Sequence, residues 1–144
     1  MTTRDELKTV MRKIKIAYKD KFIIDSETVD LWHEHLQNHE REKLEESAHR
    51  HIDNSTYPPT IADINLGAVA IEEEEARIKR DIMNNWRNMA SLHYLDDSTT
   101  KLFERAVFSQ PREKWRECGR YLTREVAAHD RELAEDVIRR VAGL

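Results

Sequence analysis

The chain has 144 residues, 36% of them charged, a net charge of −4, and only three glycines and three prolines. Its lone cysteine excludes a disulfide framework and a thiolate zinc site, and no apolar run is long enough to span a membrane or serve as a signal peptide. We therefore expect a helix-rich cytoplasmic protein with one compact domain or two small subdomains.

The first predicted helix starts at Thr3. Thr3 and Glu6 fit a capping box, in which each residue binds a backbone amide of the other. The apolar pattern fades at residues 19–21. The inward face of this helix repeats at steps of three and four residues and consists of Leu7, Val10, Met11 and Ile14.

Two further helices are predicted before residue 55. Asp25 or Ser26 can cap the second helix. Asn38 is expected to end it, and a third helix should follow over residues 39–52. The apolar face of the second helix contains Val29, Trp32 and Leu36.

The segment Ser55-Thr-Tyr-Pro-Pro-Thr60 is the least helical part of the chain. Pro58 and Pro59 each restrict the preceding residue to extended conformations. Thr60 can then cap a new helical turn, with Asp63 at its third position. Two isoleucines, Ile61 and Ile64, give that turn an apolar side.

A long amphipathic helix is predicted over residues 68–92. Gly67 is expected to mark a turn or kink before it. The apolar stripe of this helix consists of Ile71, Ile78, Ile82 and Trp86. Such a stripe could also serve as an oligomer interface.

The region 98–144 is predicted to form three helices. Ser98 or Thr99 opens the first, and Pro111 suits the first position of the second. The third is expected to run from Asp130, with Gly143 beyond its end. The chain is thus predicted to be all-α, with six or seven helices. We expect one domain over residues 1–92, including the long helix, and a boundary to a C-terminal region near residues 92–99.

The sequence gives little support for catalysis or metal binding. The clustered histidines His33, His35, His39, His49 and His51 lack HExxH spacing, and most are predicted on exposed helix faces. Cys118 is expected to be a buried structural residue. Nucleotide-binding glycine motifs are also missing from the sequence. We therefore expect no enzymatic activity, no catalytic residues, no metal site and no cofactor.

The order of motifs over residues 3–64 resembles the phage replicative-helicase loader and inhibitor family. In that family, a helix with a W-x-x-x-L pattern is followed by a short helix and a P-P-T-x-x-D-[IL] turn. The matching positions here are Trp32, Leu36, Thr60, Ile61, Asp63 and Ile64. The folded C-terminal region is a departure, since family members usually end in a shorter, poorly ordered tail.

The resemblance implies a non-enzymatic adaptor that binds a hexameric DnaB-type helicase and loads or inhibits it. It further implies contact with an origin-bound initiator. Candidate partner-binding residues lie in the proline turn and on charged helix faces: Tyr57, Pro58, Pro59, Arg77, Arg80, Arg139 and Arg140. Tyr57 could contact a partner there or fold back onto the third helix.

Two other function classes stay open. Arginines in the last two helices could contact phosphates of DNA, as in a small DNA-binding regulator, although interleaved glutamates favour only weak contact. Alternatively, the isoleucine stripe could form a structural homo-oligomer. The mildly basic chain ends and acidic middle are a weaker bias than most DNA-binding domains show.

Overall fold

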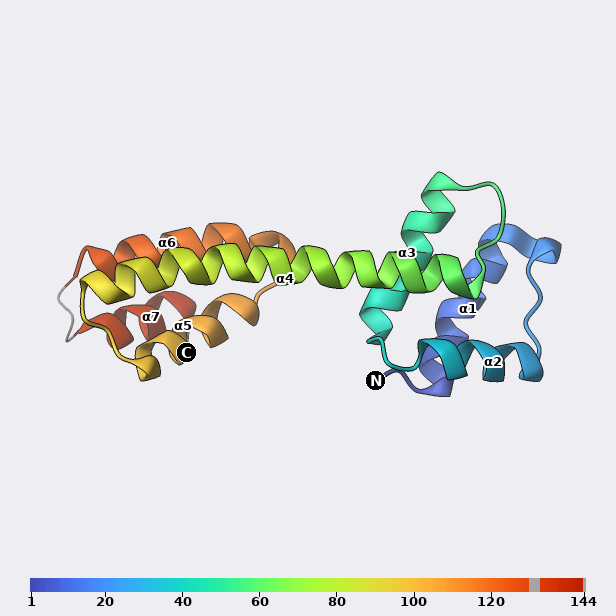
Figure 1. Cartoon of the computed structure of the whole chain (residues 1–144), viewed down its shortest axis with the longest axis horizontal. Helices are drawn as coiled ribbons and strands as arrows, with labels where there is room; N and C mark the ends of the chain where they lie inside the picture. Colours follow the sequence, from blue (N-terminus) through green and yellow to red (C-terminus); the bar gives the residue numbers. More distant parts are fainter. Residues whose placement is uncertain (130–132, 144) are drawn as a thin grey trace. The chain divides into compact units, whose positions relative to one another are not determined.

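The computed structural model describes residues 1–129 and 133–143, and Figure 1 shows the helices along the chain. The described residues form seven α-helices and two short 3-10 helices, with no strand among them. This composition confirms the predicted all-α class. The chain divides into two compact units, Met1–Glu74 and Glu75–Leu144.

The N-terminal unit contains α1 (Arg4–Tyr18), η1 (Lys19–Lys21), α2 (Ser26–Leu36), α3 (Arg41–Asn54) and the first part of α4 (Ile61–Leu92). Apolar residues from all four α-helices form one core, because each helix turns its periodic stripe inward. The fully buried members include Leu7, Met11, Ile14, Leu36, Leu44, Ile64 and Ala68.

The first two helices begin as their capping residues predict. The Glu6 amide donates to Thr3 Oγ1 at 3.2 Å, and the Thr3 amide donates to Glu6 Oε1 at 3.1 Å. Asp25 accepts from the Thr28 amide at 2.7 Å and so caps α2. These bonds satisfy amides that have no partner within the helix.

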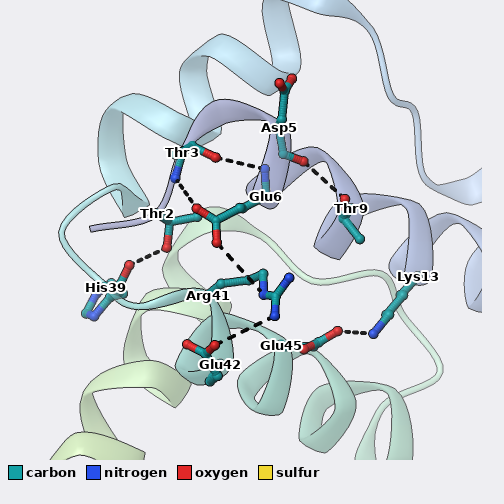
Figure 2. A network of polar contacts seen from close by, with 10 residues as sticks. All are labelled: Thr2, Thr3, Asp5, Glu6, Thr9, Lys13, His39, Arg41, Glu42 and Glu45. Carbon is teal, nitrogen blue, oxygen red and sulfur yellow. Dashed lines mark hydrogen bonds and ion pairs between the residues drawn. The ribbon is translucent and has the colours of Figure 1, made fainter.

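Polar contacts join α1 and the chain before it to α3 and the α2–α3 loop (Figure 2). The Thr2 hydroxyl donates to the carbonyl oxygen of His39, and Lys13 pairs with Glu45. A longer ion pair of 4.0 Å joins Arg41 to Glu6. The helices of this unit are therefore linked at their surfaces as well as through their core.

The α4 helix starts earlier than expected. It begins at Ile61 and passes through Gly67 without interruption, so the predicted turn or kink at Gly67 is wrong. A Cβ atom at this position would lie 2.1 Å from Ser47 Oγ. The Ser47 hydroxyl itself donates to the Ile64 carbonyl oxygen at 2.8 Å. Glycine is therefore needed for the close approach of α3, and not for a bend.

The C-terminal unit contains the rest of α4, together with α5 (Asp97–Phe108), η2 (Arg112–Lys114), α6 (Trp115–Ala127) and α7 (Ala134–Ala142). These helices share a second core. Trp86 stacks on Phe103 with ring centroids 4.0 Å apart, and its indole nitrogen donates to Thr100 Oγ1 at 2.9 Å. Other buried members are Ile82, Leu102, Val107, Leu122, Val126 and Ile138.

The boundary between the units differs from the one expected near residues 92–99. It falls inside α4, between Glu74 and Glu75, because the second part of that helix packs with α5, α6 and α7. Ile82 is buried in this second core and Ile78 packs against it. The isoleucine stripe that suggested an oligomer interface is thus largely occupied within the chain.

The helices of the C-terminal unit begin slightly differently from expectation. Asp96, and not Ser98 or Thr99, caps α5 by accepting from the Thr99 amide at 2.9 Å. Pro111 precedes the 3-10 turn η2 and does not open an α-helix.

The end of the last helix follows the prediction, since Gly143 has a left-handed φ of 71° just after α7. Its expected start at Asp130 lies outside the described residues. None of the helices in residues 1–129 and 133–143 combines the length and apolar character needed to cross a bilayer.

Candidate partner-binding surface

The α3–α4 turn is held by hydrogen bonds to its backbone. The His51 ring nitrogen Nε2 donates to the Tyr57 carbonyl oxygen at 2.8 Å, and the Tyr57 amide donates to Ser55 Oγ at 3.2 Å. The Tyr18 hydroxyl donates to the Ser55 carbonyl oxygen at 2.8 Å. The turn is therefore fixed to both α1 and α3 within the N-terminal unit.

The side chains of the turn divide into an anchor and an exposed group. Pro59 is buried and Pro58 is half-buried, so the proline pair packs against the unit. The Tyr57 side chain is 76% exposed and does not fold back onto the core. A rigid backbone that presents an exposed aromatic ring loses little conformational entropy when the ring is covered by a partner.

A reciprocal cap follows the turn, as the sequence predicts. The Thr60 amide donates to Asp63 Oδ2 at 2.9 Å, and the Asp63 amide donates to Thr60 Oγ1 at 3.2 Å. The bond from the Thr60 amide is the main reason that the pKa of Asp63 is lowered, and the charge of His51 adds to the effect. The carboxylate thus stays ionised and keeps the helix start in place.

The remaining motif residues are structural. Trp32 and Leu36 are buried in the N-terminal core, and the Trp32 ring meets Phe22 edge-on with centroids 5.5 Å apart. Ile64 is fully buried in the same core, and Ile61 packs against that core. The W-x-x-x-L and P-P-T-x-x-D-I patterns therefore specify packing and helix capping, and leave partner contact to exposed neighbours such as Tyr57.

The four candidate arginines lie in the other unit. Arg77 and Arg80 are exposed on α4, and Arg139 and Arg140 are exposed on α7. In the described part of the chain, no hydrogen bond, ion pair or shared hollow joins the α4 pair to the α7 pair. The predicted partner-binding residues are therefore distributed over two units and do not define one site within either of them.

The histidines serve as hydrogen-bonding residues of the N-terminal unit. His33 Nε2 donates to the Thr2 carbonyl oxygen at 2.9 Å, and His39 lies between Glu72 and Asn65. Over the residues that the structure describes, no group of three potential ligands is arranged to hold a metal ion. Cys118 is half-buried, and its burial raises the pKa of the thiol.

Sequence reasoning misses the residues that support the turn. Periodicity places Tyr18 and His51 only on helix faces, because their bonds to the turn depend on how α1 and α3 pack. Only Ser55, next to the prolines, carries a local signal, since serine hydroxyls often bind the backbone two residues away. The link of His39 to Asn65 and Glu72 has no such signal at all.

The N-terminal unit is thus a small helical domain in which three helices and the start of a fourth enclose one core, with a capped proline turn. Residues 1–65 match a family model that describes the N-terminal domain of a phage protein, the gene 39 protein, which is a helicase loader and inhibitor. The match confirms the resemblance found over residues 3–64, and it ends within α4. No curated protein and no solved structure matches the chain.

Proposed function

We propose that this protein is a phage or prophage replication adaptor that binds a DnaB-type hexameric helicase and loads or inhibits it in the host cytoplasm. The observation that carries the proposal is the match of residues 1–65 to the N-terminal domain of a helicase loader and inhibitor. An origin-bound initiator is the expected second partner. The chain acts by binding alone, without catalysis or cofactor.

The N-terminal unit suits a scaffold that presents a small contact surface. Its motif residues are consumed by the core and by helix capping, so they can hold a shape but cannot reach a partner. Tyr57 is the exposed member of the motif region, on a backbone fixed by Ser55 and His51. Tyrosine is one of the residues that most often contributes strongly to protein interfaces.

Loading or inhibition needs no chemistry in the adaptor. A protein that binds one state of the helicase ring more tightly than another shifts the ring toward the favoured state. The shift is limited by the ratio of the two affinities, and a tenfold ratio corresponds to about 1.4 kcal/mol. An adaptor of this kind needs a rigid surface, which the packed N-terminal unit can provide.

A binding experiment tests the proposal. The full-length chain is immobilised and exposed to a purified DnaB-type helicase, and the affinity is measured for the unmodified chain and for Tyr57→Ala. We expect binding, and a loss of about tenfold or more with Tyr57→Ala, as for an interface aromatic of average to high importance.

Tyr94→Ala is the matched control, because Tyr94 is also exposed but lies in the C-terminal unit. It should bind like the unmodified chain. If the helicase is not retained at all, the adaptor function is wrong. If the helicase is retained and Tyr57→Ala binds normally, the turn is only structural and another surface makes the contact.

A further inference from the structure

The α6 helix carries a row of arginines on its outer face. Arg116, Arg120 and Arg124 are spaced four residues apart, so they follow one another along the helix. The opposite face is buried in the C-terminal core through Trp115, Gly119, Leu122 and Val126. We call Arg116, Arg120, Arg124 and the neighbouring Tyr121 the α6 ridge.

Two of the arginines are available for a ligand. Arg116 pairs with Asp81 of α4 at 3.5 Å. In the described residues, no carboxylate lies within ion-pair distance of Arg120 or Arg124. The Arg124 guanidinium instead lies over the Tyr121 ring, 5.9 Å from its centroid. The Tyr121 side chain is itself 42% exposed.

The ridge borders an open hollow of about 680 Å³. The ridge residues line it, together with Lys114. Two carboxylates, Glu113 and Glu117, line the same hollow, so four cations face two anions. The local surface is therefore positive, although the whole chain carries a net charge of −4.

We propose that the α6 ridge binds single-stranded nucleic acid. A rise of 1.5 Å per residue separates successive arginines by about 6 Å along the helix, close to the spacing of phosphates in an extended strand. Tyr121 and the guanidinium above it offer flat surfaces on which an unpaired base stacks. A positive groove combined with an aromatic platform is the usual means of binding single strands without sequence preference.

The same features argue against two other ligands. A duplex keeps its bases paired and stacked, so it would leave the aromatic platform unused. An acidic peptide could pair with Arg120 and Arg124 but has no flat ring to place on Tyr121. The proposal concerns an activity beyond helicase binding and is independent of it.

The experiment measures fluorescence anisotropy of a labelled oligothymidylate of about 20 nucleotides, longer than the ~4–16 nucleotides that one small binding fold covers. The full-length chain is titrated at several salt concentrations between about 50 and 200 mM. Contact with three phosphates predicts a slope of about −2 in the logarithm of affinity against the logarithm of salt. We expect Arg120→Gln/Arg124→Gln to reduce the slope to about −0.7, since one contact remains.

The matched control is Arg139→Gln/Arg140→Gln, which removes the same charge from exposed positions of α7 in the same unit. It should keep both the affinity and the slope. Tyr121→Ala should weaken binding at least about fivefold, the smallest effect of losing one stacked base. Tyr121→Phe should retain binding, because the ring remains.

Three results would overturn the proposal. The first is the absence of oligonucleotide binding at the lowest salt concentration. The second is an equal loss in the α6 and α7 double variants, which would indicate general charge attraction. The third is competition by a poly-glutamate of equal charge as effective as that by unlabelled oligothymidylate, which would identify an acidic-peptide site. Circular dichroism of each variant checks that the exposed substitutions leave the fold intact.

Discussion

Tyr94 occupies a backbone conformation that is usual for glycine. Its φ is 56°, directly after the end of α4. The Leu95 amide donates to the Ala90 carbonyl oxygen at 2.9 Å, and the Tyr94 amide donates to that of Ser91 at 3.4 Å. These are the two bonds of a Schellman motif, in which the left-handed position most often carries glycine. The Tyr94 side chain is 80% exposed and offers little packing in return.

Tyr94→Gly should therefore stabilise the C-terminal unit. The left-handed conformation costs a residue with a Cβ atom about 1–2 kcal/mol, and glycine loses about 0.5–1 kcal/mol of that gain through its greater freedom in the unfolded chain. We expect a net gain of about 0.5–1 kcal/mol in urea unfolding. Tyr94→Ala keeps the Cβ atom and should give no gain. Equal stabilities of the glycine and alanine variants would contradict this explanation.

His39 is bonded at both ring nitrogens by oxygen atoms of α4. Nδ1 lies 2.6 Å from Glu72 Oε1, and Nε2 lies 2.7 Å from Asn65 Oδ1. Burial alone would lower the pKa of His39. The hydrogen bonds to Glu72 and Asn65, with the negative charge of Glu72, outweigh burial and raise the pKa above its ordinary value of 6.5. The pair of oxygens favours the doubly protonated ring.

The raised pKa of His39 makes the N-terminal unit pH-dependent. The contribution to stability is fully present below pH 6.5, the ordinary pKa, and is lost as the pH rises through the higher pKa of the folded state. Thermal unfolding should therefore show a lower melting temperature at about pH 8 than at about pH 6. His39→Gln, which cannot gain a proton, should remove most of that difference. An unchanged pH dependence in His39→Gln would rule out His39 as its source.

At the scale of helices, capping signals can be predicted from the sequence more reliably than the use of glycine. Thr3 with Glu6 and Thr60 with Asp63 are local pairs, and both caps form as expected. The sequence predicts a turn at Gly67 because glycine is a poor helix former. The purpose of this glycine depends on Ser47, which lies in another helix, and no local pattern reports that contact.

Gly67→Ala tests the close approach of α3 and α4. The new Cβ atom would lie 2.1 Å from Ser47 Oγ, so one of the two helices must shift or the Ser47 bond to Ile64 must break. Overpacking costs about 1–3 kcal/mol, against which the better helix propensity of alanine returns up to about 1 kcal/mol. We expect a net destabilisation of about 1–2 kcal/mol in urea unfolding.

A double-mutant cycle provides the control for this prediction. In the Ser47→Ala background the nearest oxygen is gone, so the further change Gly67→Ala should cost much less. Contacting residues typically show a coupling of about 0.5–3 kcal/mol. Strictly additive effects would mean that Gly67 has another role.

At the scale of the whole molecule, the sequence predicts an all-α fold but places the division of the chain too late. The periodic pattern of residues 71–86 is continuous and does not reveal which part of α4 packs with which helices. The two cores make the division clear, since Ile64 and Ala68 belong to the first and Ile82 and Trp86 to the second. Function can be inferred only for residues 1–65, where the motifs lie.

Separate cores predict separate loss of structure. Trp86→Ala removes a fully buried ring that stacks on Phe103, which should destabilise the C-terminal unit by about 3–5 kcal/mol. Hydrogen exchange should then accelerate in α5 and α6, while amides of α1 and α3 keep their protection. Leu44→Ala, in the core of the N-terminal unit, should give the reverse pattern. Equal loss of protection in both units would show that they unfold as one.

The central claim is that the chain acts on a replicative helicase, and the most direct test is the steady-state ATPase rate of a purified DnaB-type hexamer. The full-length chain is added at increasing concentration to a fixed amount of helicase. We expect the ATPase rate to fall and to level off once the ring is saturated, because the adaptor favours one state of the ring. An ATPase rate that stays unchanged at a large excess of the chain would contradict the proposed function.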